Sequence, residues 1–330
     1  MKAKANEKVV YILGAGFSAP FGLPVMSNFL EKSKDIYAIR NSISLNEDNI
    51  DFFGNVYQEI DKFRRCKDFY ASDMTNIEEI LSLFEMRKML GVESEGKIDF
   101  QKFIAQVISY YTPTEPGAQL ELFSLLRSFI KRLMRIKEAT ENGISYNDEL
   151  PFYSVLTFNY DMLWENALLH YNQKYLGYNI GKLVNEYNQK YGNIPYIKLH
   201  GTASEPQSIV TPTWKKSFEN KEASNWGIAG KILAEANHIR IIGYSLPITD
   251  SYLKYFLKWG VTNDDSNLKS IDVICLDDEQ HSVEKRYQDF IHKKLNFYNN
   301  STDNYLKAVE CGIEDAHQNL FEKSPRVQWG

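Results

Sequence analysis

The sequence predicts an α/β fold: a Rossmann-like parallel sheet with a helical insertion after its first strand and a helical extension at the C-terminus. Three observations support this prediction. Short apolar runs recur along the chain, and each is followed by glycine or polar residues and then by a helical pattern. The first run leads into a glycine turn of the kind that binds phosphates. A long segment with little strand-like character separates that run from the others.

The first strand and its glycine turn come near the N-terminus. Residues 9–13 are apolar and mostly β-branched or aromatic, which is typical of a buried strand. Gly14, Ala15, Gly16 and Ala19 follow with G-x-G-x-x-A spacing. In such a turn backbone N–H groups can approach a pyrophosphate, and the next helix N-terminus adds partial positive charge.

The segment after this turn departs from an ordinary dinucleotide-binding fold. Pro20, Gly22 and Pro24 limit the next helix to about one turn, because proline lacks the N–H donor and glycine weakens a helix interior. We therefore expect the chain to turn into a loop that covers the ligand, with Pro24 at its end.

Residues 28–149 are expected to form an inserted helical module. Apolar residues recur there at i, i+3 and i+4 spacing over residues 77–90 and 119–136, and residues 112–117 form a turn rich in proline and threonine. We expect these apolar stripes to pack in a core.

The remaining strand-like runs are 153–158, 196–199, 238–242 and 271–276. Together with the first strand they assign residues 1–27 and 150–280 to the Rossmann-like domain. Residues 281–330 are expected to form a mostly helical C-terminal extension.

The composition is that of an ordinary cytoplasmic protein. The 330 residues carry a net charge of −5, which weighs against a nucleic-acid-binding face, and no run is long enough to span a membrane or to act as a signal peptide. Three cysteines lie far apart at Cys66, Cys275 and Cys311, which fits a reducing compartment and excludes a four-cysteine zinc site.

Small and polar residues follow all five predicted strands. Ligands of open α/β sheets bind beyond the carboxyl ends of the strands, so these residues are candidates for a site. Surface loops are polar in any protein, but here glycines and functional side chains recur directly at the strand ends. The candidates are Gly14, Ala15, Gly16 and Ser18, then Thr157, Asn159 and Asp161, then His200 and Gly201, then Gly243 and Ser245, and finally Asp277.

Four ordered motifs resemble those of the sirtuin family. They are GAGFSxxxGLP at 14–24, TFNYD at 157–161, KLHG at 198–201 and GYSLP at 243–247. The chain is more closely similar to the bacterial sirtuin-like NAD-hydrolysing proteins of antiphage defence, whose features NIEE at 76–79 and PTW at 212–214 also resemble.

The chain also departs from the sirtuins that remove acyl groups from lysine. Those proteins have Asp-Phe-Arg where this sequence has Val25, Met26 and Ser27, and they carry a zinc ribbon that three distant cysteines cannot build. Both departures weigh against protein deacylation and leave the expectation of NAD binding intact.

The resemblance implies roles for Asn159 and Asp161, and the chemistry of imidazole suggests one for His200. Cleavage of the nicotinamide–ribose bond passes through an oxocarbenium-like state. Asn159 would orient the attacking water or the ribose, and Asp161 would bind the nicotinamide amide. His200 would act on the ribose hydroxyls as base or hydrogen-bond partner, or alternatively would be a strand-end histidine satisfied by the backbone.

The other candidates form the predicted cofactor-binding set. Backbone and hydroxyl donors at residues 14–18 would bind the pyrophosphate, and Gly243 and Ser245 the far phosphate or ribose. Asp277 would bond the adenosine ribose or remain a solvated loop carboxylate. Pro24, Thr157 and Gly201 complete the set. The remaining histidines show no metal-ligand spacing, so they are expected to be structural and no metal is expected: His170, His238, His281, His292 and His317.

The resulting hypothesis is an NAD glycohydrolase, and by resemblance an abortive-infection effector in antiphage defence. Two alternatives stay open: a protein deacylase or ADP-ribosyltransferase with an unusual acceptor cleft, and a non-catalytic sensor of NAD or ADP-ribose. An enzyme that freely destroyed NAD would kill its host. We therefore expect restraint through homo-oligomerisation, with residues 80–90 as a possible contact, or through a separately encoded HerA-type ATPase or Argonaute-like partner.

Overall fold

Parallel strands form the sheet that the sequence predicts. The computed structural model describes residues 3–39, 51–71, 75–91, 95–115, 117–140, 143–171, 195–209, 221–247, 250–262 and 267–311. Within these ranges six parallel strands are hydrogen-bonded in the order β5-β4-β1-β6-β7-β8. This is the strand order of doubly wound dinucleotide-binding folds. The strands are β1 (Lys8–Leu13), β4 (Phe152–Thr157), β5 (Tyr196–Lys198), β6 (His238–Ile242), β7 (Ser270–Cys275) and β8 (Leu295–Asn299).

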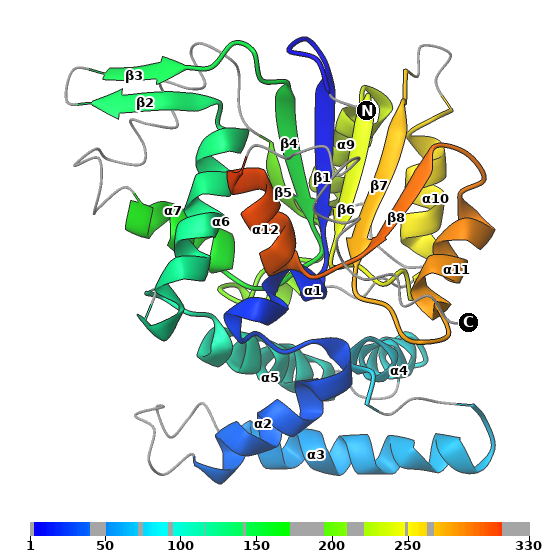
Figure 1. Ribbon diagram of the computed structural model, residues 1–330. Coiled ribbons are helices and arrows are strands. Elements are labelled where there is room, and N and C mark those ends of the chain that lie inside the picture. The colour runs from blue at the N-terminus through cyan, green and yellow to red at the C-terminus, as the bar shows by residue number, and fades with distance from the viewer. Residues whose placement is uncertain are drawn as a thin grey trace, which may run out of the picture.

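Helices cover both faces of the sheet, because the side chains of β1 alternate between two apolar cores. Val9, Tyr11 and Leu13 belong to the front core, which also contains residues of α6 (Leu120–Leu133), α7 (Leu163–Tyr171) and α12 (Thr302–Glu310). Val10 and Ile12 belong to the back core, with residues of α9 (Lys221–Ala234), α10 (Ser251–Trp259) and α11 (Ser282–Phe290). Figure 1 shows α6 and α12 in front of the strands and α9 behind them.

The prediction that the helix after the first strand has about one turn is confirmed. Helix α1 (Ala15–Ser18) is a single turn, followed by the 3-10 turn η1 (Ala19–Phe21), which ends at Gly22 with φ of 90°. A helix of this length cannot cover the sheet beside β1. Helices α6 and α12 cover it instead: the Tyr11 and Phe129 ring centroids are 5.2 Å apart, and the Tyr11 and Tyr305 hydroxyls are 3.0 Å apart.

The helical module lies at the carboxyl ends of the strands, as Figure 1 shows for α2, α3, α4 and α5. Its buried residues form the module core, in which the ring centroids of Phe53 and Phe103 are 4.8 Å apart. Ala203 and Ile209 from the loop after β5 join this core, and Tyr160 packs against it. The module is therefore attached to the loops of the sheet. Its elements are η2 (Met26–Asn28), α2 (Phe29–Ala38), α3 (Asp51–Phe63), η5 (Arg64–Asp68), α4 (Ile77–Met89), α5 (Glu95–Tyr111) and η6 (Gly117–Gln119).

Two elements differ from the sequence expectation. An antiparallel hairpin, β2 (Ile136–Thr140) with β3 (Gly143–Tyr146), follows α6 in a segment expected to lack strands. Strand β8 lies in the tail expected to be helical, where it pairs with β7 at the edge of the sheet. Its half-buried residues, LNFYN, lack the continuous apolar run by which buried strands are recognised.

In the described part of the chain, no helix combines the length and the apolar character needed to cross a bilayer.

Candidate functional site

The loops after β1 and β6 meet where the strand order reverses, which is the position of the ligand crevice in doubly wound sheets. Gly14 N–H donates to Ile242 O at 3.0 Å, and Gly16 N–H donates to Gly243 O at 2.8 Å. A Cβ atom on Gly14 would lie 2.6 Å from Gly243 O. Gly243 has φ of 64°, and its Cβ would lie 2.0 Å from Phe17 N. The glycines therefore allow two loops to touch.

This contact adds a second role to the predicted phosphate turn. In this structure the Gly16 N–H serves the neighbouring loop, while Ala15 is exposed and Gly16 half-buried. Pro24 is buried after η1. Pyrophosphate binding by residues 14–18 stays a prediction.

Three predicted side chains form one hydrogen-bonded network between β1 and β4. Asn159 Nδ2 donates to Gly14 O at 2.9 Å and to Ser18 Oγ at 3.1 Å. Ser18 Oγ in turn donates to Asp161 Oδ2 at 2.8 Å. Thr157, which is buried, accepts the Asn159 N–H at 3.1 Å and so fixes the turn that carries the network.

Asp161 is a buried carboxylate at the start of α7. Its Oδ1 accepts the Leu163 N–H at 3.0 Å, where the helix N-terminus favours negative charge. Burial raises the pKa of Asp161, and the hydrogen bonds from Ser18 and Leu163 and the charge of Lys198 offset this only in part. The carboxylate is thus held in a place where its charge is costly, which is common at functional sites.

His200 lies in an aromatic cluster behind this network. Its side chain is buried, and its ring centroid lies 4.8 Å from that of Phe158 and 6.3 Å from that of Tyr160. The Phe158 ring lies 5.3 Å from that of Tyr244. We define the aromatic cluster as Phe158, Tyr160, His200, Trp226 and Tyr244.

Gly201 allows the loop after His200 to fold back. It has φ of 88°, and a Cβ there would lie 2.0 Å from Ser208 O in the 3-10 turn η8 (Pro206–Ser208). Thr202 N–H donates to Ser208 Oγ at 2.9 Å. This loop then delivers Ala203 and Ile209 to the module core.

The predicted residues for the far end of the ligand lie by α11. Arg286 Nε donates to Ser245 O at 3.1 Å. The Asp277 carboxylate accepts the N–H groups of Val283 at 2.8 Å and Glu284 at 2.9 Å, so it caps the helix. Ribose binding by Asp277 stays a prediction.

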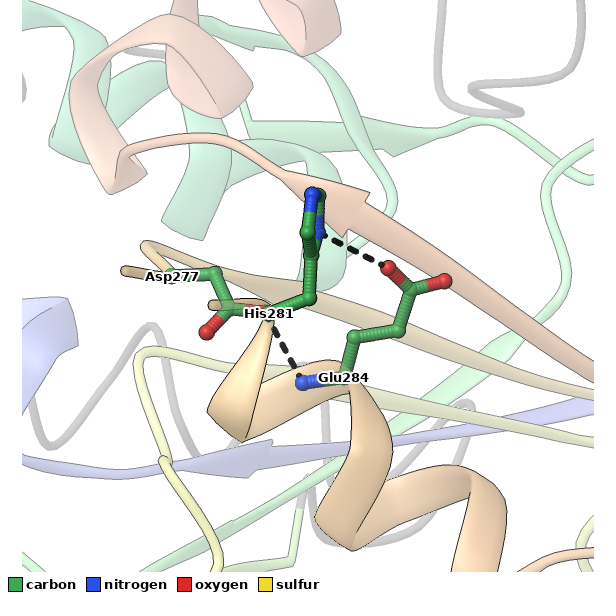
Figure 2. Close-up of side chains that lie close together, drawn as sticks. All are labelled: Asp277, His281 and Glu284. Atoms are coloured by element: carbon green, nitrogen blue, oxygen red, sulfur yellow. Dashed lines mark hydrogen bonds and ion pairs between the residues drawn. The ribbon is translucent and has the colours of Figure 1, made fainter. Parts of the chain in front are cut away.

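Asp277 also belongs to a group that could hold a metal ion. Among the described residues, Asp277, His281 and Glu284 place one ligand atom each within 4.8 Å of one another. Figure 2 shows the His281 ring facing Glu284, with Nδ1 3.4 Å from Oε2. His281 was expected to be structural, yet it is exposed. The Asp277 oxygens already accept two N–H groups. These three side chains alone therefore do not establish a metal site.

The other histidines fall in different places. His238 is buried at the start of β6, with Nδ1 2.9 Å from Ser270 Oγ and Nε2 3.0 Å from Glu7 Oε2. His292 is exposed. The His170 side chain and all of His317 lie outside the described part of the structure, as do residues 212–214.

Lys198 is a site residue that the sequence reasoning missed. Its Nζ lies 3.1 Å from Glu165 Oε1 and 3.3 Å from Thr202 Oγ1, and it donates to Asp161 O. It thus joins the loops after β4 and β5. A lysine at the end of an otherwise apolar strand was the available signal.

One family model matches part of the chain. Residues 153–297 match the family model of the SIR2-like domain, a stretch that begins in β4 and ends in β8. No curated protein matches the chain.

Similar solved structures include a Sir2 in complex with an inhibitor, 2′-O-acetyl-ADP-ribose and a deacetylated peptide, which is 13% identical with a TM-score of 0.35. Two others are Sir2Tm bound to a propionylated peptide, 15% identical with a TM-score of 0.34, and a structure on sirtuin substrate affinity, 13% identical with a TM-score of 0.36. Each match covers 92% of this chain and 93% or 94% of the other. Scores this low support no conclusion about activity. Residues 153–297 are therefore similar to the SIR2-like domain, and the ordered motifs at 157–161, 198–201 and 243–247 lie within this stretch.

Proposed function

We propose that the protein binds NAD at the carboxyl ends of β1, β4, β5 and β6 and hydrolyses it to nicotinamide and ADP-ribose. The observation that supports this best is the network of Ser18, Asn159 and Asp161. It lies at the reversal of strand order in a dinucleotide-type sheet, within and beside the stretch that matches the SIR2-like domain.

The chemistry requires little acid catalysis, because the pyridinium of NAD is already a good leaving group. The site must hold the dinucleotide, stabilise the cationic sugar and place a water. The Asp161 carboxylate supplies negative charge. The Asn159 amide is oriented by its two donated bonds, so that its Oδ1 can accept a hydrogen bond from the attacking water. His200 would contact the ribose hydroxyls.

An assay with and without an acetyl-lysine peptide tests this function. Purified protein is incubated with NAD, and nicotinamide and ADP-ribose are followed by chromatography. Turnover without peptide supports the hydrolase, turnover only with peptide supports the deacylase, and binding without turnover supports the sensor. Asn159→Ala and His200→Ala should each abolish turnover with unchanged circular dichroism. Asn304→Ala, which removes an exposed amide on α12, is the matched control.

One observation weighs against the structural zinc ribbon of the deacylase sirtuins. Cys275 is a buried thiol, and burial raises its pKa to about 12. Metal content measured by atomic emission should show no stoichiometric zinc.

A role in antiphage defence rests on the motif resemblance. We propose that the protein acts in the cytoplasm as an abortive-infection effector, depleting NAD when activated. Its restraint would come from a homo-oligomer or from a HerA-type ATPase or Argonaute-like partner. Phage challenge of cells that carry the wild type or Asn159→Ala, with intracellular NAD as the readout, tests this role.

A further inference from the structure

Helix α4 brings a carboxylate from the helical module to the strand ends. Asn76 Oδ1 accepts the N–H groups of Glu78 at 2.9 Å and Glu79 at 3.2 Å, which fixes the start of the helix. Ile77 is buried in the module core, against which Tyr160 of the loop after β4 also packs. Figure 1 shows α4 at the carboxyl ends of the strands.

Glu78 is close enough to interact with two members of the aromatic cluster. Burial raises the pKa of Tyr160, and the charges of Glu78 and Asp250 raise it further. Burial also raises the pKa of Tyr244, again with contributions from Asp250 and Glu78. The Oε2 atom of Glu78 is buried. The carboxylate therefore lies within electrostatic range of Tyr160 after β4 and Tyr244 after β6.

This side of the site is negatively charged and aromatic. Glu78, Asp161 and Asp250 all adjoin the aromatic cluster or its network, and Lys198 is already ion-paired with Glu165. The pyrophosphate of NAD is anionic, whereas its nicotinamide ring is cationic. Carboxylates and aromatic faces both attract a cation, so the ring fits this side.

We propose that Glu78 is a positioning residue that directs the cationic nicotinamide–ribose end of NAD toward the aromatic cluster. The proposal rests on the proposed function in that NAD is the ligand. It gives the helical module a part in the site: α4 adds a carboxylate to those of Asp161 and Asp250 on the loops of the sheet.

The test compares two ligands that differ in the charge of the ring. A non-hydrolysable carbocyclic NAD carries the cationic ring, and NADH carries a neutral one. Their affinities are measured by calorimetry for the wild type, Glu78→Gln and the control Glu79→Gln. The wild type should prefer the cationic ligand. Glu78→Gln should reduce that preference by about five- to tenfold while NADH affinity stays constant, and Glu79→Gln should leave it unchanged.

An unchanged preference in Glu78→Gln, or an equal loss for both ligands, would overturn the proposal, because a structural role weakens both. If Glu78→Gln does not fold, Glu78→Asp is measured beside the wild type. Both proteins keep the carboxylate, so both should bind carbocyclic NAD more tightly than NADH. Equal affinity for the two ligands in either protein refutes the proposal. A wild type that binds the cationic ligand but releases no nicotinamide from NAD contradicts the hydrolase alone. A wild type that binds neither ligand contradicts both.

Discussion

Gly243 is the residue whose backbone tolerates the least change. Its positive φ and the 2.0 Å approach of its would-be Cβ to Phe17 N make any side chain clash with α1. We expect Gly243→Ala to lower the free energy of unfolding by roughly 2–4 kcal/mol and to weaken NAD binding, because the loops after β1 and β6 must separate. Urea denaturation measures the first effect and calorimetry the second.

Gly227 in α9 is the matched control. It is exposed in the helix, and nothing lies within 4 Å of a Cβ at that position. Gly227→Ala should therefore stabilise the protein by about 0.5–1 kcal/mol. A similar loss in both variants would contradict the close contact at Gly243.

The Asp161 carboxylate should lower the stability of the fold at neutral pH and be required for NAD cleavage. Its folded pKa is raised, so its favourable contribution to folding belongs to the protonated form and is lost as the pH rises through that pKa. At pH 7 we expect Asp161→Asn to raise the free energy of unfolding by about 1 kcal/mol while losing NAD cleavage. The stability difference should shrink toward acidic pH.

Asp289→Asn, at an exposed position on α11, provides the comparison and should change neither property. A lower free energy of unfolding for Asp161→Asn than for the wild type at pH 7 would refute the prediction.

The sequence predicted that Ser18, Asn159 and Asp161 lie close together. Each of them follows a predicted strand, and parallel strands end at the same edge of a sheet. The approach of Glu78 to Tyr160 could not be inferred, since Glu78 lies on α4 and nothing local in the sequence states where an inserted helix docks.

At the scale of elements, the amino ends of β1, β6 and β7 are joined by Glu7. Glu7 Oε2 accepts the Lys4 N–H at 2.7 Å and lies 3.0 Å from His238 Nε2, and Oε1 is ion-paired with Lys269. Burial raises the pKa of Glu7, but these bonds outweigh it and lower the pKa from 4.5 to about 2. The ionised form therefore stabilises the fold fully above pH 4.5, and this contribution is lost as the pH falls through 2.

We expect Glu7→Gln to cost about 2 kcal/mol at pH 7, and less and less below pH 4.5. Denaturation curves across that range measure the difference. Glu235→Gln removes an exposed ion pair to Lys8 at the same end of the sheet and should cost under about 0.5 kcal/mol. Equal costs would contradict the role of Glu7.

All five predicted strands are present, and β6 and β7 are buried along their whole length. Strand β8 was missed because an edge strand needs only half of its surface apolar. Its Asn296 donates to Asp272 at 2.7 Å, a contact that exists only once β7 is in place.

At the scale of the whole molecule, we expect activity to depend on assembly. Met86 and Met89 on α4 and Leu90 directly after it are 52%, 56% and 71% exposed, and they could form the oligomer contact expected at residues 80–90. On dilution, the molar mass measured by light scattering and the NAD turnover per molecule should fall together. A monomer with full activity at every concentration, and without a partner, would refute the prediction.

The one-turn α1 has a consequence for biosynthesis. Because this helix leaves the sheet uncovered beside β1, the front core needs Tyr305, Leu306 and Val309 of α12 in addition to the residues of α6 and α7. A nascent chain still lacking these residues exposes an apolar sheet face, and contacts that join the two ends of a chain form slowly. Nascent chains should thus stay inactive until residues 302–310 have been synthesised and have packed against the sheet, which would delay any NAD loss during synthesis.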